Sequence, residues 1–279
     1  RMPGAESDLT EWKRQLWLSA DICNSLPYRQ SRKVYLAVYA AERTGNPHAF
    51  DHGTRDGHLL EQIIEKDLEL RNRKVELSEA FPAYKRQKSY LLAGLLIDDV
   101  SNYALLSGVH AVKKDGVYHR GMEGFCAEQN MVQVPLAVLS EWERMECDHN
   151  EIWIVENPSI FARLCGEYPC MCMNGQPRLA GLLVLDLLAE AGTVIHYAGD
   201  LDPEGLLIAQ KLSQYYKGVF YYWHMTEEDY HMCRSKEALS ERRIGMLQKI
   251  TDPRLLPVAR AIAEYGMAGY QEKIDYRGR

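Results

Sequence analysis

The sequence predicts an α/β fold: a parallel sheet of four strands with flanking helices, preceded by a mainly α-helical region. Two observations lead to this prediction. Four short apolar runs follow one another after residue 150, and segments of helical periodicity separate them. Apolar runs of this length are typical of parallel strands that are buried on both faces. We therefore place a boundary near residue 148, with a helical region over 1–148 and an α/β domain over 149–279.

Segments of helical periodicity dominate the first 148 residues. The predicted helices span 6–26, 31–45, 55–74, 83–109 and 133–145. The second of them stops at Gly45, which suits a helix C-cap. The fourth has an unusually apolar middle, which favours a place in the core.

Strands and helices alternate in the second part of the chain. The predicted strands span 151–155, 169–173, 193–198 and 218–223. The helical patterns between them lie at 159–166, 178–191 and 205–215. This alternation predicts right-handed crossovers between parallel strands. The tail, 236–274, is predicted to form two more helices with a break near Pro253.

The composition is ordinary for a globular protein in water, with 46% hydrophobic and 26% charged residues. No run approaches the ~20 apolar residues of a membrane helix, and no signal peptide is visible. We therefore expect no membrane contact and a cytoplasmic location. The net charge of −6 argues against tight non-specific DNA binding by this chain alone. Because the first residue is Arg1, we expect the natural chain to begin earlier.

The seven cysteines contain no C-x-x-C pair, so a structural zinc site is not expected. Cys170 and Cys172 alternate with methionines in the second predicted strand, where cysteine serves as a small hydrophobic residue.

Acidic side chains follow two of the predicted strands, at the edge of the sheet where ligands of open parallel sheets bind. Glu156 follows the first strand, and Asp200, Asp202 and Glu204 follow the third. Carboxylates that converge in this way repel each other unless a cation neutralises them. Hard divalent cations such as Mg²⁺ prefer oxygen ligands of this kind. The pattern therefore indicates a metal site at this edge.

Part of the pattern also has a purely structural explanation. Asp202 followed by Pro203 fits a helix N-cap, and Glu204 suits the positive end of the helix dipole. Capping does not explain Asp200, which lies two residues earlier, or Glu156, which ends an apolar strand. For Asp202, capping and metal binding both remain open.

Longer stretches around these carboxylates resemble a known domain. "IWIVEN" and "HYAGDLDPEG" resemble the Toprim domain, whose signature is a glutamate after the first strand and D-x-D after the third. The D-x-D-P-x-G form is similar to the A subunit of topoisomerase VI. "VENPSIF", "MNGQPRLAGLLVLD" and "YAGDLDPEG" are more closely similar to the C-terminal part of JetD-type nuclease subunits of Wadjet plasmid-defence systems. The resemblance is specific over 151 to about 225 and looser upstream.

The resemblance implies a four-stranded, Rossmann-like Toprim sheet and cleavage of DNA phosphodiester bonds that depends on Mg²⁺ or Mn²⁺. By the same resemblance, Glu156, Asp200 and Asp202 are the expected catalytic residues and metal ligands. Glu204 would serve a second metal or favour the helix N-terminus.

The resemblance also implies partners. Double-stranded DNA is the expected substrate, with contacts from Asn174, Arg163 and Arg178, although solvent-exposed arginines that only aid solubility remain the alternative. A condensin-like SMC complex and a second copy of the chain are the expected protein partners. The acidic net charge would fit a nuclease that such partners load or hold on DNA.

The sequence departs from the Toprim pattern at one position, because Asn157 follows the glutamate where many Toprim domains have glycine. None of the 17 tyrosines lies in a recognisable nucleophile motif, so hydrolysis by water is favoured over a topoisomerase-like reaction. A Toprim module that binds DNA or proteins without catalysis remains a second hypothesis. A primase is a third, which no basic nucleotide-binding segment supports.

Overall fold

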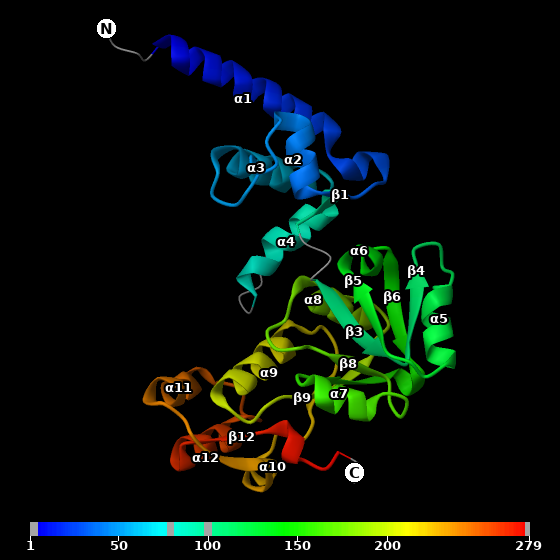
Figure 1. Ribbon diagram of the computed structural model, residues 1–279, viewed down its shortest axis with the longest axis vertical. Helices are drawn as coiled ribbons and strands as arrows, with labels where there is room; N and C mark the ends of the chain where they lie inside the picture. Colours follow the sequence, from blue (N-terminus) through cyan, green and yellow to red (C-terminus); the bar gives the residue numbers. More distant parts are fainter. Residues whose placement is uncertain (1–4, 77–80, 98–101, 277–279) are drawn as a thin grey trace. The chain divides into compact units, whose positions relative to one another are not determined.

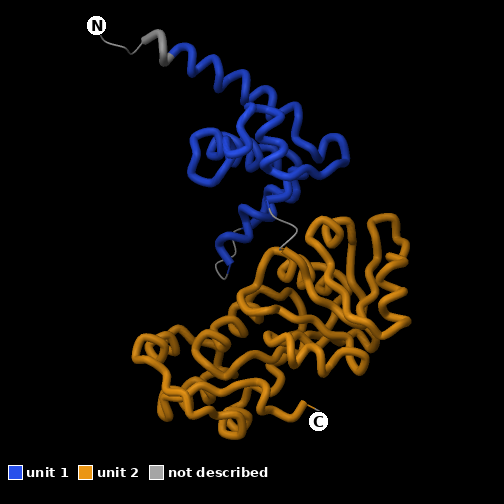
Figure 2. The backbone as a smooth tube through the Cα atoms, in the orientation of Figure 1, with its two compact units in different colours: residues 1–99 blue, residues 100–279 orange. Residues whose placement is uncertain are grey.

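The structure is a computed structural model that describes residues 5–76, 81–97 and 102–276. The chain forms two compact units, unit 1 over residues 1–99 and unit 2 over residues 100–279 (Figure 2). This division falls earlier in the chain than the predicted boundary near residue 148. Residues 103–147 belong to unit 2 and form four strands with two short helices, rather than the end of a helical region.

Unit 1 is mainly helical (Figure 1). It contains helices α1 (Ala5–Ser25), α2 (Leu36–Thr44), α3 (Arg55–Leu70) and α4 (Pro82–Leu92), the 3₁₀ turn η1 (Pro27–Gln30) and the parallel pair of short strands β1 (Val34–Tyr35) and β2 (Leu95–Leu96). The first three predicted helices are confirmed, with a strand at the start of the second. Gly45 ends α2 with a left-handed φ of 76°, as a C-cap requires.

The centre of unit 2 is a six-stranded mixed sheet. Its strands are β3 (Tyr103–Ser107), β5 (Val132–Pro135), β7 (Glu151–Val155), β8 (Cys170–Cys172), β9 (Val194–Ala198) and β10 (Phe220–Tyr222). They lie in the order β10-β9-β7-β8-β3-β5. The four strands predicted from the sequence form and are parallel to one another, but β3 and β5 add an antiparallel edge. The sheet is therefore larger and more mixed than the predicted one.

Two pairs of antiparallel strands and a set of helices complete unit 2. The pairs are β4 (Val109–Lys113) with β6 (Trp142–Cys147) and β11 (Arg234–Ala238) with β12 (Met267–Gly269). The helices are α5 (Arg120–Ala127), α6 (Leu136–Leu139), α7 (Pro158–Leu164), α8 (Leu179–Glu190), α9 (Pro203–Tyr215), α10 (Glu227–Cys233), α11 (Glu241–Met246) and α12 (Leu256–Tyr265). Short 3₁₀ turns are η2 (Asp148–Asn150), η3 (Leu247–Lys249) and η4 (Gln271–Lys273).

Two predicted helices are wrong in part. The segment 83–109 contains α4, β2 and β3, and 133–145 is divided among β5, α6 and β6. A short apolar run fits a buried helix and a buried strand equally well, so periodicity alone does not separate them. Gly108 ends β3 with a φ of 66° and allows the chain to pass close to Pro169. The tail also differs from prediction, because β11 and β12 pair within it.

The apolar composition of α8 follows from its position in the fold. This helix contacts β3 of the large sheet and β6 of the small one. Eight of its residues are buried, among them Leu182 and Leu185. A helix that is covered on several sides is apolar around most of its circumference. Across the described ranges, no helix is both long and apolar enough to span a membrane.

Candidate active site

The order of the strands creates a crevice between β7 and β9. The chain leaves β7 through α7 toward β8 on one side, and it leaves β9 through α9 toward β10 on the other side. Open α/β sheets bind ligands at such a topological switch point, beyond the carboxyl ends of the strands. Val155 and Ala198 are neighbours at these two ends. The backbone N–H of Glu156 donates to the carbonyl of Ala198 at 3.1 Å, so the residues that follow both strands lie side by side.

Glu156 lies in this crevice with one carboxylate oxygen unsatisfied. Its Oε2 is buried and accepts no hydrogen bond from any described residue. Burial, followed by the negative charges of Asp200 and Asp202, raises the pKa of Glu156 to about 7. Gly199 leaves room for this carboxylate, because a Cβ atom there would lie 3.2 Å from Oε2 and 3.1 Å from the Tyr197 hydroxyl. The structure therefore brings Glu156 and Asp200 together, as the sequence predicts.

Asp200 is also partly buried. Its Oδ1 accepts a hydrogen bond of 3.1 Å from the backbone N–H of Gln271. Burial raises the pKa of Asp200 to about 6, and the neighbouring charges of Asp202 and Glu272 act in the same direction, whereas the Gln271 bond opposes them. Two adjacent carboxyl groups with raised pKa values are typical of a functional site.

Asp202 caps α9, as its capping interpretation predicts. Its Oδ1 accepts the backbone N–H of Gly205 at 2.8 Å, and Pro203 follows at the first helical position. Its Oδ2 accepts a hydrogen bond of 2.6 Å from Arg243. Glu204 pairs with the same guanidinium at 2.7 Å. Arg243 therefore joins the two carboxylates in the first turn of α9.

The C-terminal part of the chain closes one side of the crevice. Leu201 forms an antiparallel bridge with Gly269 at the end of β12, and the Asn157 side-chain amide donates to Glu272 at 2.5 Å. Gln271 is fully buried, and neither polar atom of its side chain has a partner among the described residues. Gln271 and Arg243 are not predicted from the sequence. No local motif marks them, because they reach the site only through tertiary contacts.

Two of the three residues expected to contact DNA lie together. Asn174 and Arg178 line a hollow of about 180 Å³ with Pro158 and Cys172. This hollow adjoins the crevice, since the Cys172 thiol donates to the Glu156 carbonyl at 3.5 Å. Arg163 is exposed near the end of α7 and is not among the residues that line the hollow.

The residues at the crevice fit a divalent cation in part. Over the ranges that the structure covers, no group of three or more His, Cys, Asp and Glu side chains is arranged to hold a metal ion. The buried, unsatisfied Oε2 of Glu156 beside Asp200 is nevertheless the environment in which a cation would relieve repulsion. Asp202 and Glu204, by contrast, are engaged by Arg243.

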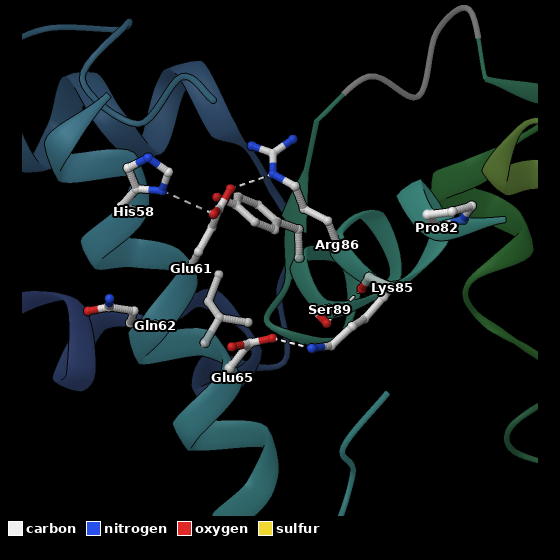
Figure 3. A pocket seen from close by; sticks show the side chains of 10 residues that line it. His58, Glu61, Gln62, Glu65, Pro82, Lys85, Arg86 and Ser89 are labelled. Atoms are coloured by element: carbon white, nitrogen blue, oxygen red, sulfur yellow. Dashed lines mark hydrogen bonds and ion pairs between the residues drawn. The ribbon is translucent and has the colours of Figure 1, made fainter. Parts of the chain in front are cut away.

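A second hollow, in unit 1, has a different character. It has a volume of about 350 Å³ and lies between α3 and α4 (Figure 3). Two ion pairs between the helices line it, Arg86 with Glu61 and Lys85 with Glu65. The charges neutralise each other and connect the two helices, and none of the residues singled out in the sequence lines this hollow. It is therefore not the candidate site.

The fold and the crevice define an α/β protein with an acidic site at a topological switch point. Residues 132–275, more than half of the chain, match the family model described as "Protein of unknown function C-terminus (DUF2399)", and the chain belongs to this family. Residues 7–111 match a second model, "Protein of unknown function N-terminus (DUF3323)". No curated protein matches the chain. Neither family description names a Toprim domain or a nuclease.

The raised pKa of Glu156 predicts how stability changes with pH. A carboxyl group whose pKa is higher in the folded state stabilises the fold below its ordinary pKa, and this contribution is lost as pH rises through the folded value of about 7. Without a divalent cation, Glu156→Gln should therefore be more stable than wild type at pH 8, by about 2–4 kcal/mol. Thermal unfolding at pH 8 and pH 4 in EDTA measures this, and the difference should vanish at pH 4. A variant that unfolds at a lower temperature than wild type at pH 8 would contradict the assignment.

Proposed function

We propose that this protein is a metal-dependent DNA endonuclease that cleaves phosphodiester bonds by hydrolysis. The observation that carries the proposal is the pair Glu156 and Asp200 at the switch point, both partly buried and both with a raised pKa. A carboxylate with a structural role is usually paired with a cation or a hydrogen-bond donor. The buried Oε2 of Glu156 has no such partner among the residues that the structure describes.

The roles of the residues follow from their positions. A bound Mg²⁺ or Mn²⁺ would neutralise the developing charge on the phosphate. Glu156 and Asp200 would hold it, joined by Asp202 and Glu204 if Arg243 releases them. A pKa of about 7 also suits Glu156 to accept a proton from the attacking water near neutral pH. The backbone N–H of Gln271 holds Asp200 in position.

The resemblance to Toprim domains and JetD-type subunits supports the choice of substrate and partners. The D-x-D of the signature corresponds to Asp200 and Asp202, and its glutamate to Glu156. We therefore include in the proposal an anti-plasmid role in the cytoplasm, next to a condensin-like SMC complex, with a homodimer as the working unit. The hollow lined by Asn174 and Arg178 offers a contact for the DNA backbone beside the crevice.

A plasmid assay tests the proposed activity. The purified chain is incubated with supercoiled plasmid in Mg²⁺, in Mn²⁺ or in EDTA, alone and with a condensin-like SMC complex. We expect nicked or linear products only with a divalent cation, and faster cleavage with the complex. Equal amounts of product in EDTA would contradict a metal-dependent reaction, and no product under any of these conditions would contradict the nuclease.

One observation favours a second function, a Toprim module that binds DNA or a partner protein without catalysis. Arg243 engages Asp202 and Glu204, and the described residues hold no metal-binding group of three or more side chains. This alternative predicts no heat of Mn²⁺ binding by calorimetry. It also predicts that Asp200→Asn binds DNA and partners as well as the wild type does.

A further inference from the structure

Arg243 occupies the two carboxylates that begin α9. Its Nε lies 3.0 and 2.9 Å from the two carboxylate oxygens of Glu204, and its Nη2 lies 2.6 Å from Asp202 Oδ2. The backbone N–H of Gly205 donates to the other Asp202 oxygen. All four carboxylate oxygens of these two residues therefore accept hydrogen bonds from the protein itself.

A divalent cation cannot use these oxygens while the guanidinium is in place, because two positive charges in one position repel each other. We propose that Arg243 is a resident counter-ion, which holds Asp202 and Glu204 in the metal-free protein and is displaced when a divalent cation binds. Arg243 thus lowers the affinity of the site for the cation. This inference rests on the proposed function, because it requires that the site binds a divalent cation.

The location of Arg243 permits such a displacement. Helix α11 has no buried residue, so its movement exposes little apolar surface. The Arg243 side chain is 33% exposed, so water already contacts part of it while it is paired with the carboxylates. Glu204 is 39% exposed, so water screens its pair with Arg243, whereas Asp202 is only 13% exposed and its pair is screened less. A cation with two charges can therefore compete with the guanidinium for Asp202 and Glu204.

The charges at the crevice explain why a counter-ion is present at all. Asp202 lies close enough to Asp200 and Glu156 for its charge to raise the pKa values of both. Without a cation, these three carboxylates would repel one another at the switch point, and Glu204 adds a further negative charge beside Asp202. Arg243 reduces this repulsion in the metal-free protein. Once a divalent cation supplies the positive charge, the guanidinium is no longer required there.

Calorimetric titration of the full-length chain with MnCl₂ tests the inference. We expect Arg243→Gln to bind Mn²⁺ about tenfold more tightly than wild type, since one competing contact is removed. Arg243→Lys should lie between them, because an ammonium group cannot fork across two carboxylates. Arg242→Gln is the matched control, an exposed neighbour on α11 whose affinity should equal that of the wild type.

Thermal unfolding gives a second measurement. Metal-free Arg243→Gln should unfold at a lower temperature than wild type, and Mn²⁺ should raise its unfolding temperature by more. If the wild type binds Mn²⁺ and Arg243→Gln binds it equally or more weakly, the counter-ion inference is overturned while the nuclease proposal stands. If neither protein binds Mn²⁺, the proposed metal-dependent function fails as well. Should Arg243→Gln not fold, Arg243→Lys provides the same comparison.

Discussion

Asp200→Asn is expected to abolish metal-dependent plasmid cleavage, with a loss of at least about 10³-fold in rate. Asparagine keeps an oxygen that accepts the hydrogen bond from the Gln271 N–H, so the position of the side chain is preserved. It removes one of the negative charges that a divalent cation would need. The measurement is the initial rate of plasmid nicking in Mg²⁺ or Mn²⁺ at pH 8, where Asp200 of the wild type is ionised, given its pKa of about 6.

The control for this variant removes a carboxylate elsewhere in unit 2. Asp115→Asn changes an exposed residue that pairs with Lys113 near the end of β4. We expect cleavage by Asp115→Asn at the wild-type rate and unchanged far-UV circular dichroism for both variants. Cleavage by Asp200→Asn at the wild-type rate would exclude the crevice as the catalytic site. If only Asp115→Asn lost activity, the site would have to lie elsewhere in unit 2.

The sequence is sufficient to predict the four parallel strands, because each is a short apolar run bounded by turn residues. It is not sufficient for β3. Residues 103–107 form a short apolar run that fits a helix or a strand, and the antiparallel partners that make them a strand are distant in the sequence. Tertiary pairing thus decided between helix and strand where the local pattern allowed both. The same reason accounts for the early division of the chain into its two units.

The sequence likewise predicts some residues of the candidate site and not others. Glu156 and Asp200 could be predicted because each follows its strand directly, and parallel strands end at one edge. Arg243 lies 41 residues beyond Asp202, and Gln271 lies 71 residues beyond Asp200, with no motif around either. Their contacts depend on how the last part of unit 2 folds back over the crevice. Sequence patterns therefore find the carboxylates but miss the groups that neutralise and position them.

Gly205→Ala is expected to cost about 2–4 kcal/mol of folding stability, a large effect for one methyl group. Gly205 lies in the first turn of α9, where the helix passes against the backbone of Asp200. A Cβ atom at this position would lie 2.2 Å from the Asp200 carbonyl oxygen and 3.0 Å from its carbonyl carbon. Both are backbone atoms, so neither can be relieved by a change of rotamer. The unfolding temperature should fall by roughly 10 °C.

A backbone shift that relieves this clash would also displace the carboxylate of Asp200. If the Asp200 peptide shifts, its carboxylate loses the 3.1 Å hydrogen bond from Gln271 and its alignment with Glu156. Gly205→Ala should therefore bind Mn²⁺ more weakly even at temperatures where it is folded. Gly124→Ala is the matched control: Gly124 lies exposed in α5, a Cβ atom there meets nothing within 4 Å, and alanine should be neutral or slightly stabilising. If the two substitutions changed the free energy of unfolding by the same amount, the close contact between α9 and the Asp200 backbone would not be important for stability. In that case, the glycine of D-x-D-P-x-G would have to be explained by something other than the position of this carboxylate.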